Sequence, residues 1–488
     1  MSTKTKSYYS RLFTGHRPGY PHKVLTQLAE KLKDIPANRG NRKRMPGSAC
    51  SGYAYLGQFI NHDLSLDSTD WESAGDVEPE KTQNKKTARL DLEPLYGGES
   101  NDGSVIYDGD KLGLGRTKSD KRGRASSDND LPRDKNGIAT IPDGRNDITL
   151  LIAQLHVLLI KFHNRIVDDL STGNIPSAGP DEGSSFAKAR RLVTWHYQWI
   201  VKNDFLSTLV APDVLQDIMM HWPRLYRPKQ GKATVPVEFA WAAFQYGHSA
   251  VQSTYNINRS AARLSLVETF YMTGRGGLAK PNDPQNVQLP ERYVVDAGRM
   301  FGWAPPGVSN VAEEIDTLIA KGLYEIPLGF VLFLTGTPAR LAFAAKGNAT
   351  LTEITLRRGA GIGIPSGQEA CRLAGVDALS ADQLAFGDDL TVFLRRNGLL
   401  ESTPLFYYIL REAEVAGRAS PGGRPCKRLG PLGSRIVAEV LLGILKADED
   451  SFMHYAWQPP LIRLKRSNQT IRVDSLKKLA FYASGRAV

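Results

Sequence analysis

One segment of this chain constrains its fold more than any other. Residues Ile148–Leu170 read ITLLIAQLHVLLIKFHNRIVDDL, so a helix over this range would be apolar on almost every face. Because other elements must cover such a helix, the segment predicts a buried central helix of a large domain. Asn146 or Asp147 stands immediately before it and can cap its first turn.

The other strongly patterned segments also predict helices. Phe186–Leu209 is a second long helical stretch that is rich in Trp and Tyr. Few segments alternate in the manner of strands, and no period indicates an internal repeat. The expected fold class is therefore mainly α, with further helices at Tyr53–Leu64, Glu238–Gln252, Val311–Ala320, Thr337–Lys346 and Arg435–Leu445.

Long polar loops separate some of these segments. Between Asp67 and Gly144 the composition changes to Gly, Asp, Lys, Ser and Pro, and similar loops lie at Gly274–Gln288 and Ala416–Gly430. Candidate active-site residues stand on both sides of the first loop. We therefore expect one large domain over residues 1–488, in which residues 67–144 are a loop-rich insertion.

The bulk composition is that of a soluble globular protein, with 41% hydrophobic and 23% charged residues. Apolar runs such as Ile315–Ile319 and Leu328–Leu334 are far too short to cross a bilayer. The first residues, MSTKTKSYYSRLF, lack the hydrophobic core of a signal peptide. We therefore expect a cytoplasmic protein, and the alternative is export by a route that needs no cleaved signal.

The chain is basic, with 62 Lys and Arg against 51 Asp and Glu and a net charge of +11. Its local basic runs, Lys81–Arg89 and Arg116–Arg124, lie among Ser, Gly and Asp, which favours solvated loops over a nucleic-acid groove. The three cysteines, Cys50, Cys371 and Cys426, are widely separated. They predict neither a disulfide scaffold nor a metal site.

His62 is the first histidine whose neighbours suggest chemistry. In GQFINHDLSLD, Gln58 and His62 are four residues apart, so on a helix they share a face at about 6 Å. Asp63 would project about 100° away from them. An imidazole beside an amide suits proton transfer to a small polar ligand, and the adjacent carboxylate could serve a cation. A structural role for His62 is equally compatible with this motif alone.

His248 is the second, and it follows a glycine in a predicted helix, FAWAAFQYGHSAVQ. A neutral imidazole is a usual axial ligand of haem iron, and small neighbours let the flat macrocycle approach. From this motif alone, an ordinary core histidine is the favoured alternative. The remaining histidines have no such surroundings and are interpreted as surface, packing or core residues: His16, His22, His156, His163, His196, His221 and His454.

Several of these segments, in this order, resemble the animal haem peroxidases of the peroxidase–cyclooxygenase superfamily. GQFINHDL is similar to the distal motif of that family and FQYGH to its proximal motif. RNDITLLIAQLHVLLIKFHNR matches the distal arginine and the helix that follows it, and ARRLVTWHYQWIVKNDFL the next helix. LRRGAGIGIPSGQ, TPLFYYIL and LGPLGSRIVAEVLLG resemble later family segments. The resemblance runs from about Tyr8 to Trp457, and Ile364–Gln368 leans toward the bacterial branch.

The resemblance implies a mainly α, single-domain peroxidase fold with haem between central helices and long irregular loops. It implies that His248 is the proximal iron ligand and His62 the distal acid and base. Arg145 would polarise the peroxide, and Gln58 would hold a water. Arg358 falls where the family has an arginine near a haem propionate, which is a natural charge pair.

The resemblance also implies a calcium site. Asp63 falls on a family calcium ligand, and the rest of the site would be Thr87, the carbonyl of Arg89, Asp91 and Glu93. Oxygens from alternate residues of one loop suit a hard cation that takes six to eight such ligands. The alternative is that Asp91 and Glu93 are ordinary loop carboxylates.

Departures from the family pattern change what we expect of the cofactor. Asn61 stands where the family has an ester-forming aspartate, Ile148 at its ester-forming glutamate and Thr149 at its sulfonium-forming methionine. We therefore expect haem b that is held without covalent links. Thr355 aligns with the asparagine that accepts a hydrogen bond from the proximal histidine, and Gln245 replaces a family arginine.

These positions imply a haem peroxidase that reduces hydrogen peroxide and oxidises a small organic donor, a halide or thiocyanate, with poor oxidation of chloride. One alternative is a fatty-acid dioxygenase on the same scaffold, but the radical-forming tyrosine of those relatives would fall on Gln245. Two alternatives come from other classes: a metal phosphohydrolase built on His62 and Asp63, and a basic nucleic-acid-binding protein.

Overall fold

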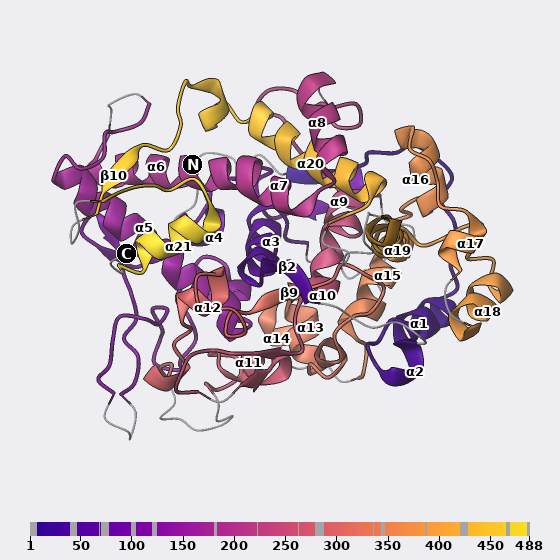
Figure 1. Ribbon diagram of the computed structural model, residues 1–488, viewed down its shortest axis with the longest axis horizontal. Coiled ribbons are helices and arrows are strands. Elements are labelled where there is room, and N and C mark those ends of the chain that lie inside the picture. The colour runs from indigo at the N-terminus through magenta and orange to yellow at the C-terminus, as the bar shows by residue number, and fades with distance from the viewer. Residues whose placement is uncertain are drawn as a thin grey trace.

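Figure 1 shows the computed structural model of the chain. The structure describes residues 7–39, 46–67, 69, 78–98, 104–119, 124–179, 183–221, 223–261, 263–278, 287–334, 336–342, 347–385, 388–419, 428–464 and 469–485. Cys426, the end of the helix expected at Thr337–Lys346 and part of the basic run Arg116–Arg124 lie outside the described residues. Within them, helices predominate and strands are short, so the expected mainly α class is confirmed.

The apolar segment forms the central helix, α5 (Leu150–Ser171), which is buried along most of its length. It packs against α6 (Ser185–Ile200), α3 (Gly52–Leu64) and α21 (Leu476–Ala483). By length and composition α5 could cross a membrane, but 78% of its most apolar window is buried inside the protein, as in the core helix of a globular domain. The described residues contain no other helix that passes this test.

The cap expected for α5 is wrong. The backbone of Thr149 is extended, and its hydroxyl accepts a hydrogen bond from the amide of Ile152, so Thr149 is the N-cap. Asn146 and Asp147 lie in the preceding 3-10 turn, η2 (Gly144–Asp147), and their side chains bind elsewhere. The turn leaves both side chains free for tertiary contacts that a sequence pattern does not reveal.

The second long helix is continuous over the expected range. α6 passes through a π turn, η3 (Val201–Phe205), into α7 (Leu206–Leu209). The helix expected at Arg435–Leu445 is also confirmed, as α20 (Pro431–Ala447), and it packs against α19 (Leu405–Ala419). Figure 1 shows α3 near the middle of the molecule, with α5 and α6 on one side and α15 and α19 on the other.

Two expected helices are wrong. Residues 238–252 contain α9 (Val237–Ala240), the 3-10 turn η4 (Ala243–Tyr246) and α10 (Gly247–Ala250), because Ala242 leaves the helical region with φ −135° and ψ −76°. Residues 311–320 begin with strand β9 (Val311–Glu313), bend at residues 315–317 and then form a parallel bridge between Ile319 and Lys33. A short apolar run fits a buried extended segment as well as a helix.

The strands form one three-stranded sheet and several two-stranded sheets among the described residues. β1 (Ser7–Ser10) pairs antiparallel with β3 (Gln83–Asn84) and parallel with β6 (Val235–Pro236). β2 (Pro46–Cys50) pairs antiparallel with β9. Three further antiparallel pairs are β4 (Tyr107–Asp108) with β5 (Lys111–Leu112), β7 (Thr254–Tyr255) with β8 (Leu264–Ser265), and β10 (Leu461–Arg463) with β11 (Thr470–Arg472).

The remaining helices surround this core. They are α1 (His22–Lys31), α2 (Pro36–Arg39), α4 (Glu93–Tyr96), α8 (Pro212–His221), α11 (Leu266–Tyr271), α12 (Ala297–Phe301), α13 (Leu328–Leu334), α14 (Ala339–Ala342), α15 (Leu351–Gly361), α16 (Gly367–Ala374), α17 (Ala381–Leu384) and α18 (Asp388–Arg396), with short 3-10 turns η1 (Pro79–Lys81), η5 (Glu291–Tyr293), η6 (Lys321–Tyr324) and η7 (Phe452–His454).

The described part of residues 67–144 is mainly irregular, as expected, but buried ion pairs between side chains hold it to the helical core. Arg133 pairs with Asp130 at 2.9 Å and with Asp147 at 2.7 Å. Both carboxylates and the guanidinium are almost fully buried. This loop-rich segment is therefore anchored at the start of α5, close to the residues of the candidate site.

Candidate active site

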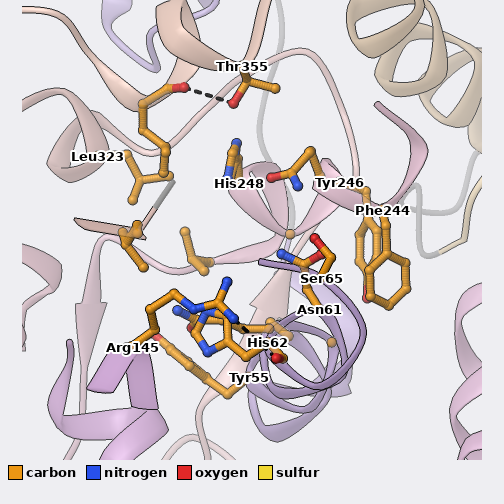
Figure 2. A pocket seen from close by; sticks show the side chains of 18 of the residues that line it. Tyr55, Asn61, His62, Ser65, Arg145, Phe244, Tyr246, His248, Leu323 and Thr355 are labelled. Carbon is orange, nitrogen blue, oxygen red and sulfur yellow. Dashed lines mark hydrogen bonds between the residues drawn. The ribbon is translucent and has the colours of Figure 1, made fainter. Parts of the chain in front are cut away.

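A pocket lies where α3, η2, η4, α10 and α15 converge, and it encloses about 1130 Å³ of atom-free space, part of it open to solvent. Gln58, His62 and Arg145 line it together with His248 and Thr355. Figure 2 shows His62 and Arg145 side by side on the lower wall and His248 on the opposite one. The fold thus brings together residues that are far apart in the sequence.

His62 lies on the buried face of α3. Its Nδ1 is 2.7 Å from Oδ1 of Asn146, and Nδ2 of Asn146 lies 3.1 Å from Nδ1 of His156. Because an amide oxygen can only accept, this network assigns the proton of His62 to Nδ1 and leaves Nε2 with a free lone pair. Burial, together with the Arg145 charge, lowers the pKa of His62 to about 3. The imidazole is therefore a neutral base at neutral pH.

Arg145 is held beside His62 by Asp143. The carboxylate of Asp143 accepts from the backbone amide and Nε of Arg145, both at 3.0 Å, and from Nη2 at 2.7 Å. Nη2 also donates to the carbonyl of His62 at 3.1 Å. Among the described residues Nη1 has no partner, and Arg145 lines the pocket. Burial would raise the pKa of Asp143, but Arg145 and Lys86 outweigh it and hold that pKa well below its usual value.

Gln58 lies one turn before His62 on α3 and lines the same pocket, as the four-residue spacing predicted. Gly57 lets α3 come close to η4, because a Cβ at this position would lie 2.8 Å from the hydroxyl oxygen of Tyr246. Asn61 also lines the pocket, and its Oδ1 is buried without a hydrogen-bond partner in the described part of the chain.

His248 stands on α10, directly after the 3-10 turn. Burial lowers its pKa to about 4, so the ring is neutral at neutral pH. Its Nδ1 is buried and has no hydrogen-bond partner among the residues described. A Cβ at Gly247 would meet no atom within 4 Å, so open space lies beside the residue that precedes His248.

Thr355 lines the pocket on the same side as His248 (Figure 2), but its hydroxyl donates to the carbonyl of Leu351 at 2.8 Å. No hydrogen bond joins Thr355 to His248 within the described residues. A threonine in a helix commonly bonds the carbonyl four residues earlier. The expected acceptor is thus nearby but bound to its own helix.

Arg358 also lines the pocket and is already paired. Its Nη2 lies 2.5 Å from Oδ2 of Asp67, and its guanidinium stacks 4.8 Å from the ring centroid of Trp241. The Arg358 and Asp67 side chains are both nearly buried. An anionic group that bound Arg358 would therefore share it with Asp67.

Asp63 points away from the pocket, as its place on α3 predicted. Its carboxylate accepts from the amides of Leu92 at 3.3 Å and Glu93 at 2.8 Å, and from the Tyr197 hydroxyl at 3.1 Å. Glu93 in turn accepts from the amide of Thr87 at 3.2 Å. The structure therefore places Asp63, Thr87 and Glu93 together.

Asp91 lies in the same loop, and its Oδ1 is buried without a partner among the described residues. Burial and the neighbouring carboxylates raise the pKa of Asp63, and burial and Glu93 raise the pKa of Asp91 to about 6. The Arg89 side chain is engaged with Asp448 and Asp450. As they stand, no three His, Cys, Asp or Glu side chains of the described residues are arranged to hold a metal ion.

Three residues of this site were not expected from the sequence: Asn146, Asp143 and Lys86. Asp143 has a local signal, since it lies two residues before Arg145 and caps its turn. Asn146 contacts His62, 84 residues away, and Lys86 contacts Asp143, 57 residues away, and the sequence offers no periodic signal for either contact.

Residues 56–275 match the family model of the animal haem peroxidases. The chain is 24% identical to Peroxidase mlt-7 of Caenorhabditis elegans over 339 residues, which are 66% of this chain and 39% of that protein. It is 30% identical to the chorion peroxidase of Drosophila melanogaster over 134 residues, 26% of this chain and 16% of that protein. The chain thus spans well under half the length of these relatives.

Solved structures share the fold. Peroxidase A from Dictyostelium discoideum superposes with a TM-score of 0.60 at 14% identity, over 92% of this chain and 88% of that one. The fatty acid alpha-dioxygenase of Oryza sativa gives a TM-score of 0.58 at 13% identity, over 98% and 79%.

The matched residues 56–275 contain Gln58, His62, Arg145 and His248, the four side chains that the fold gathers around one pocket. The chain therefore matches the animal haem peroxidase family over residues 56–275, has peroxidases among its sequence relatives and shares its fold with a solved peroxidase structure.

Proposed function

We propose that this chain is a haem-dependent peroxidase that reduces hydrogen peroxide and oxidises a small organic donor, a halide or thiocyanate. The observation that carries the proposal is the pair of neutral histidines, His62 and His248, on opposite walls of one pocket, with Arg145 beside His62. A neutral imidazole on one wall suits an axial iron ligand, and a base with a cation on the other suits a bound peroxide.

The pocket residues fit haem. The imidazole of His248 has an unpartnered Nδ1 within the described residues and open space beside Gly247, and much of the lining is apolar. Arg358 offers a cation to a propionate. When bound, haem would supply the iron that binds peroxide and carries the oxidising equivalents.

Attachment without covalent links is part of this proposal. Asn61 and Thr149 line the pocket, but an amide and a secondary alcohol do not form the family's ester and sulfonium links. Ile148 is fully buried and inert. The cofactor would therefore be haem b, held by His248, by burial and by contacts to its propionates.

The chain's own residues would move the protons. Nε2 of His62 accepts a proton from the peroxide and returns it to the departing oxygen, so that water leaves. Nη1 of Arg145 stabilises the negative charge that develops as the O–O bond breaks. Gln58 orients a water through its amide. With an organic donor, two electrons from the donor and two protons from the donor or solvent complete the reduction of one peroxide to two waters. With a halide or thiocyanate, the second oxygen passes to the anion together with one proton, and only one water forms.

The pocket favours a peroxidase over a fatty-acid dioxygenase. The position three residues before His248 is Gln245, whose amide cannot form the tyrosyl radical that the dioxygenase reading requires. Its Nε2 donates to the carbonyl of Ala240 at 2.6 Å and so holds the end of α9.

We also propose that Ca²⁺ binds to Asp63, Thr87, the carbonyl of Arg89, Asp91 and Glu93. The unpartnered, buried Oδ1 of Asp91 and the mutual repulsion of Asp63, Asp91 and Glu93 support a cation here. A hard divalent cation takes such oxygens. Binding would require Glu93 to turn from its present partners toward the ion.

Haem titration of the purified chain tests the main proposal. The wild-type chain should bind one haem with a Soret band, and His248→Ala should lose or greatly weaken it. His196→Ala is the matched control, because His196 is also a buried histidine but bonds the carbonyl of Leu192 away from the pocket. Equal haem binding by His248→Ala, with unchanged ligand-field bands, would refute the assignment.

A further inference from the structure

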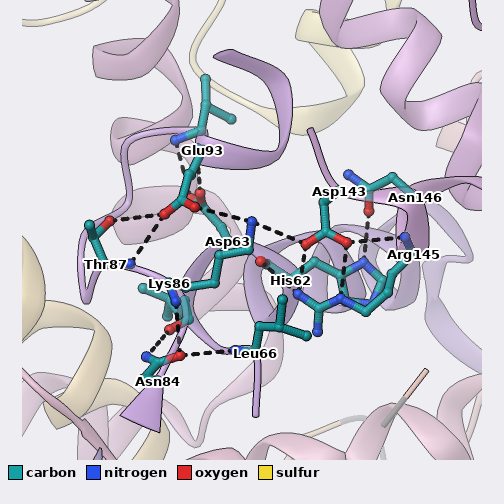
Figure 3. A network of polar contacts seen from close by, with 12 residues as sticks. His62, Asp63, Leu66, Asn84, Lys86, Thr87, Glu93, Asp143, Arg145 and Asn146 are labelled. Atoms are coloured by element: carbon teal, nitrogen blue, oxygen red, sulfur yellow. Dashed lines mark hydrogen bonds and ion pairs between the residues drawn. The ribbon is translucent and has the colours of Figure 1, made fainter. Parts of the chain in front are cut away.

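Lys86 is a buried lysine that lies between Glu93, in the loop of residues 86–93, and Asp143, which binds Arg145 of the pocket (Figure 3). The Lys86 side chain is only 4% exposed. Its Nζ lies 3.2 Å from Oε1 of Glu93 and 3.2 Å from Oδ2 of Asp143. A buried ammonium needs such partners, so Lys86 is held between the two carboxylates.

Asp143 is shared in turn between two cations. Its Oδ2 accepts from Lys86 and from Nη2 of Arg145 at 2.7 Å, while Oδ1 accepts from Nε of Arg145 at 3.0 Å. The carboxylate is itself buried, at 4% exposure. With both oxygens occupied, Asp143 cannot rotate without breaking a charge-assisted hydrogen bond.

This arrangement determines where Arg145 points. Asp143 and the carbonyl of His62 together bind Nε and Nη2 of Arg145, and Nη1 is left without a partner in the described part of the chain. Loss of Lys86 would remove one charged contact from Oδ2, so the carboxylate and the guanidinium it holds would gain freedom. Small errors in the position of a donor are costly in a low-dielectric site.

We propose that Lys86 is a positioning residue that acts on Arg145 through Asp143. This inference rests on the proposed function, because it concerns the anion that Arg145 would meet in the pocket. It adds to that function a link from the loop of residues 86–93 to the distal cation. In a purely structural role, Lys86 would only neutralise buried carboxylates and would leave the affinity of the pocket for anions unchanged.

Fluoride binding to the haem-loaded protein tests the proposal. Fluoride is a small anion whose binding to ferric haem is read from the absorption spectrum, and Nη1 of Arg145 is the cationic donor available to it. At fixed pH, Lys86→Met should weaken fluoride binding about 10-fold, the order of one charge-assisted hydrogen bond. Lys86→Arg should restore the affinity to within about 3-fold of wild type, since it keeps a cation between the two carboxylates.

Arg435→Met is the matched control. Arg435 is also a buried cation between two carboxylates, Asp217 at 2.5 Å and Glu439 at 3.0 Å, but it does not line the pocket. It should lose stability as Lys86→Met does and keep the wild-type affinity for fluoride. Wild-type affinity in Lys86→Met, or an equal loss in Arg435→Met, would overturn the positioning role.

A second comparison applies if Lys86→Met does not fold. Lys86→Met/Asp143→Asn removes one cation and one carboxylate together, and Asp143→Asn alone is its reference. If Lys86 acts through Asp143, the two variants should bind fluoride equally, within about 2-fold. A further 10-fold loss in the double variant would contradict that route. A wild-type chain that takes up no haem would refute the proposed function and this inference together, whereas normal haem uptake with unchanged fluoride binding would refute only the role of Lys86.

Discussion

Replacing His62 by alanine separates proton transfer from haem binding. His62 is neutral, and its Nε2 is free because Asn146 fixes the proton on Nδ1. Every folded molecule therefore offers the base, and its loss should slow the reaction with peroxide by about 10²–10⁴-fold, the usual contribution of a positioned base. Haem affinity should change by less than about 3-fold, since the expected iron ligand, His248, lies on the opposite wall.

The same substitution has a predictable cost in stability. It leaves Oδ1 of Asn146 unsatisfied in a buried position, which costs about 1–3 kcal/mol. His156→Ala is the matched control. His156 is about as buried as His62 and accepts a hydrogen bond from Nδ2 of Asn146, but it does not line the pocket. It should lose similar stability and slow the peroxide reaction by less than about 10-fold.

Rapid mixing of the haem-loaded variants with hydrogen peroxide measures this rate from the change in haem absorption, and thermal unfolding measures the stability. Wild-type rates in His62→Ala would refute the assignment of His62 as the base, whatever the resemblance to the family. A loss of rate in His156→Ala as large as in His62→Ala would instead show that the slow reaction follows from damage to the buried network.

Four further outcomes are expected. Arg145→Ala should slow the peroxide reaction by about 10²-fold, since it removes charge stabilisation of about 3 kcal/mol, while Gln58→Ala should cost less; the same rapid-mixing assay ranks them. Acidified organic solvent should extract the haem, and haem that stays with the polypeptide in denaturing mass spectrometry would contradict attachment without covalent links. Metal analysis should find calcium, and chelation or Asp63→Ala should change both the haem spectrum and the activity; fully active enzyme without calcium would end that proposal. Burial raises the pKa of Glu412 to about 7, so the stability that comes from its protonated form is full below about pH 4.5 and is lost as pH rises through about 7. The stability of Glu412→Gln relative to wild type should therefore rise between pH 5 and pH 8, by no more than about 3 kcal/mol. A stability difference between the two proteins that does not change with pH would refute the raised pKa.

The sequence predicted those helices whose burial follows from their own pattern of apolar residues. α3 and α5 are continuous apolar patterns, and their observed bounds lie within two residues of the expected ones. The same reasoning failed around His248, because the break at Ala242 lies within an unbroken run of helix-compatible residues. It failed at residues 311–320 because a buried extended segment is as apolar as a buried helix.

In the candidate site, too, residues on one helix could be placed from the sequence, and contacts between distant segments could not. Gln58 and His62 could be placed together from their spacing on one helix, and Asp63 could be placed away from them. The contacts of Asn146 with His62 and of Lys86 with Asp143 join segments that are 84 and 57 residues apart, and no local pattern encodes them. The sequence therefore predicted which candidate groups share the pocket, but not the contacts of Asn146 and Lys86 that hold His62 and Asp143 in place.

The buried charges behind the pocket connect these proposals. Four carboxylates, those of Asp63, Asp91, Glu93 and Asp143, lie in one region with two cations, Lys86 and Arg145. If all four carboxylates were ionised, two negative charges would be left over, and burial makes such an excess costly, in line with the raised pKa values of Asp63 and Asp91. A divalent cation among Asp63, Asp91 and Glu93 would balance it. Lys86 contacts both Glu93 and Asp143, so an ion that bound Glu93 would leave Lys86 paired with Asp143 alone. Removal of the ion would then change the position of Arg145, because Asp143 binds both Lys86 and Arg145.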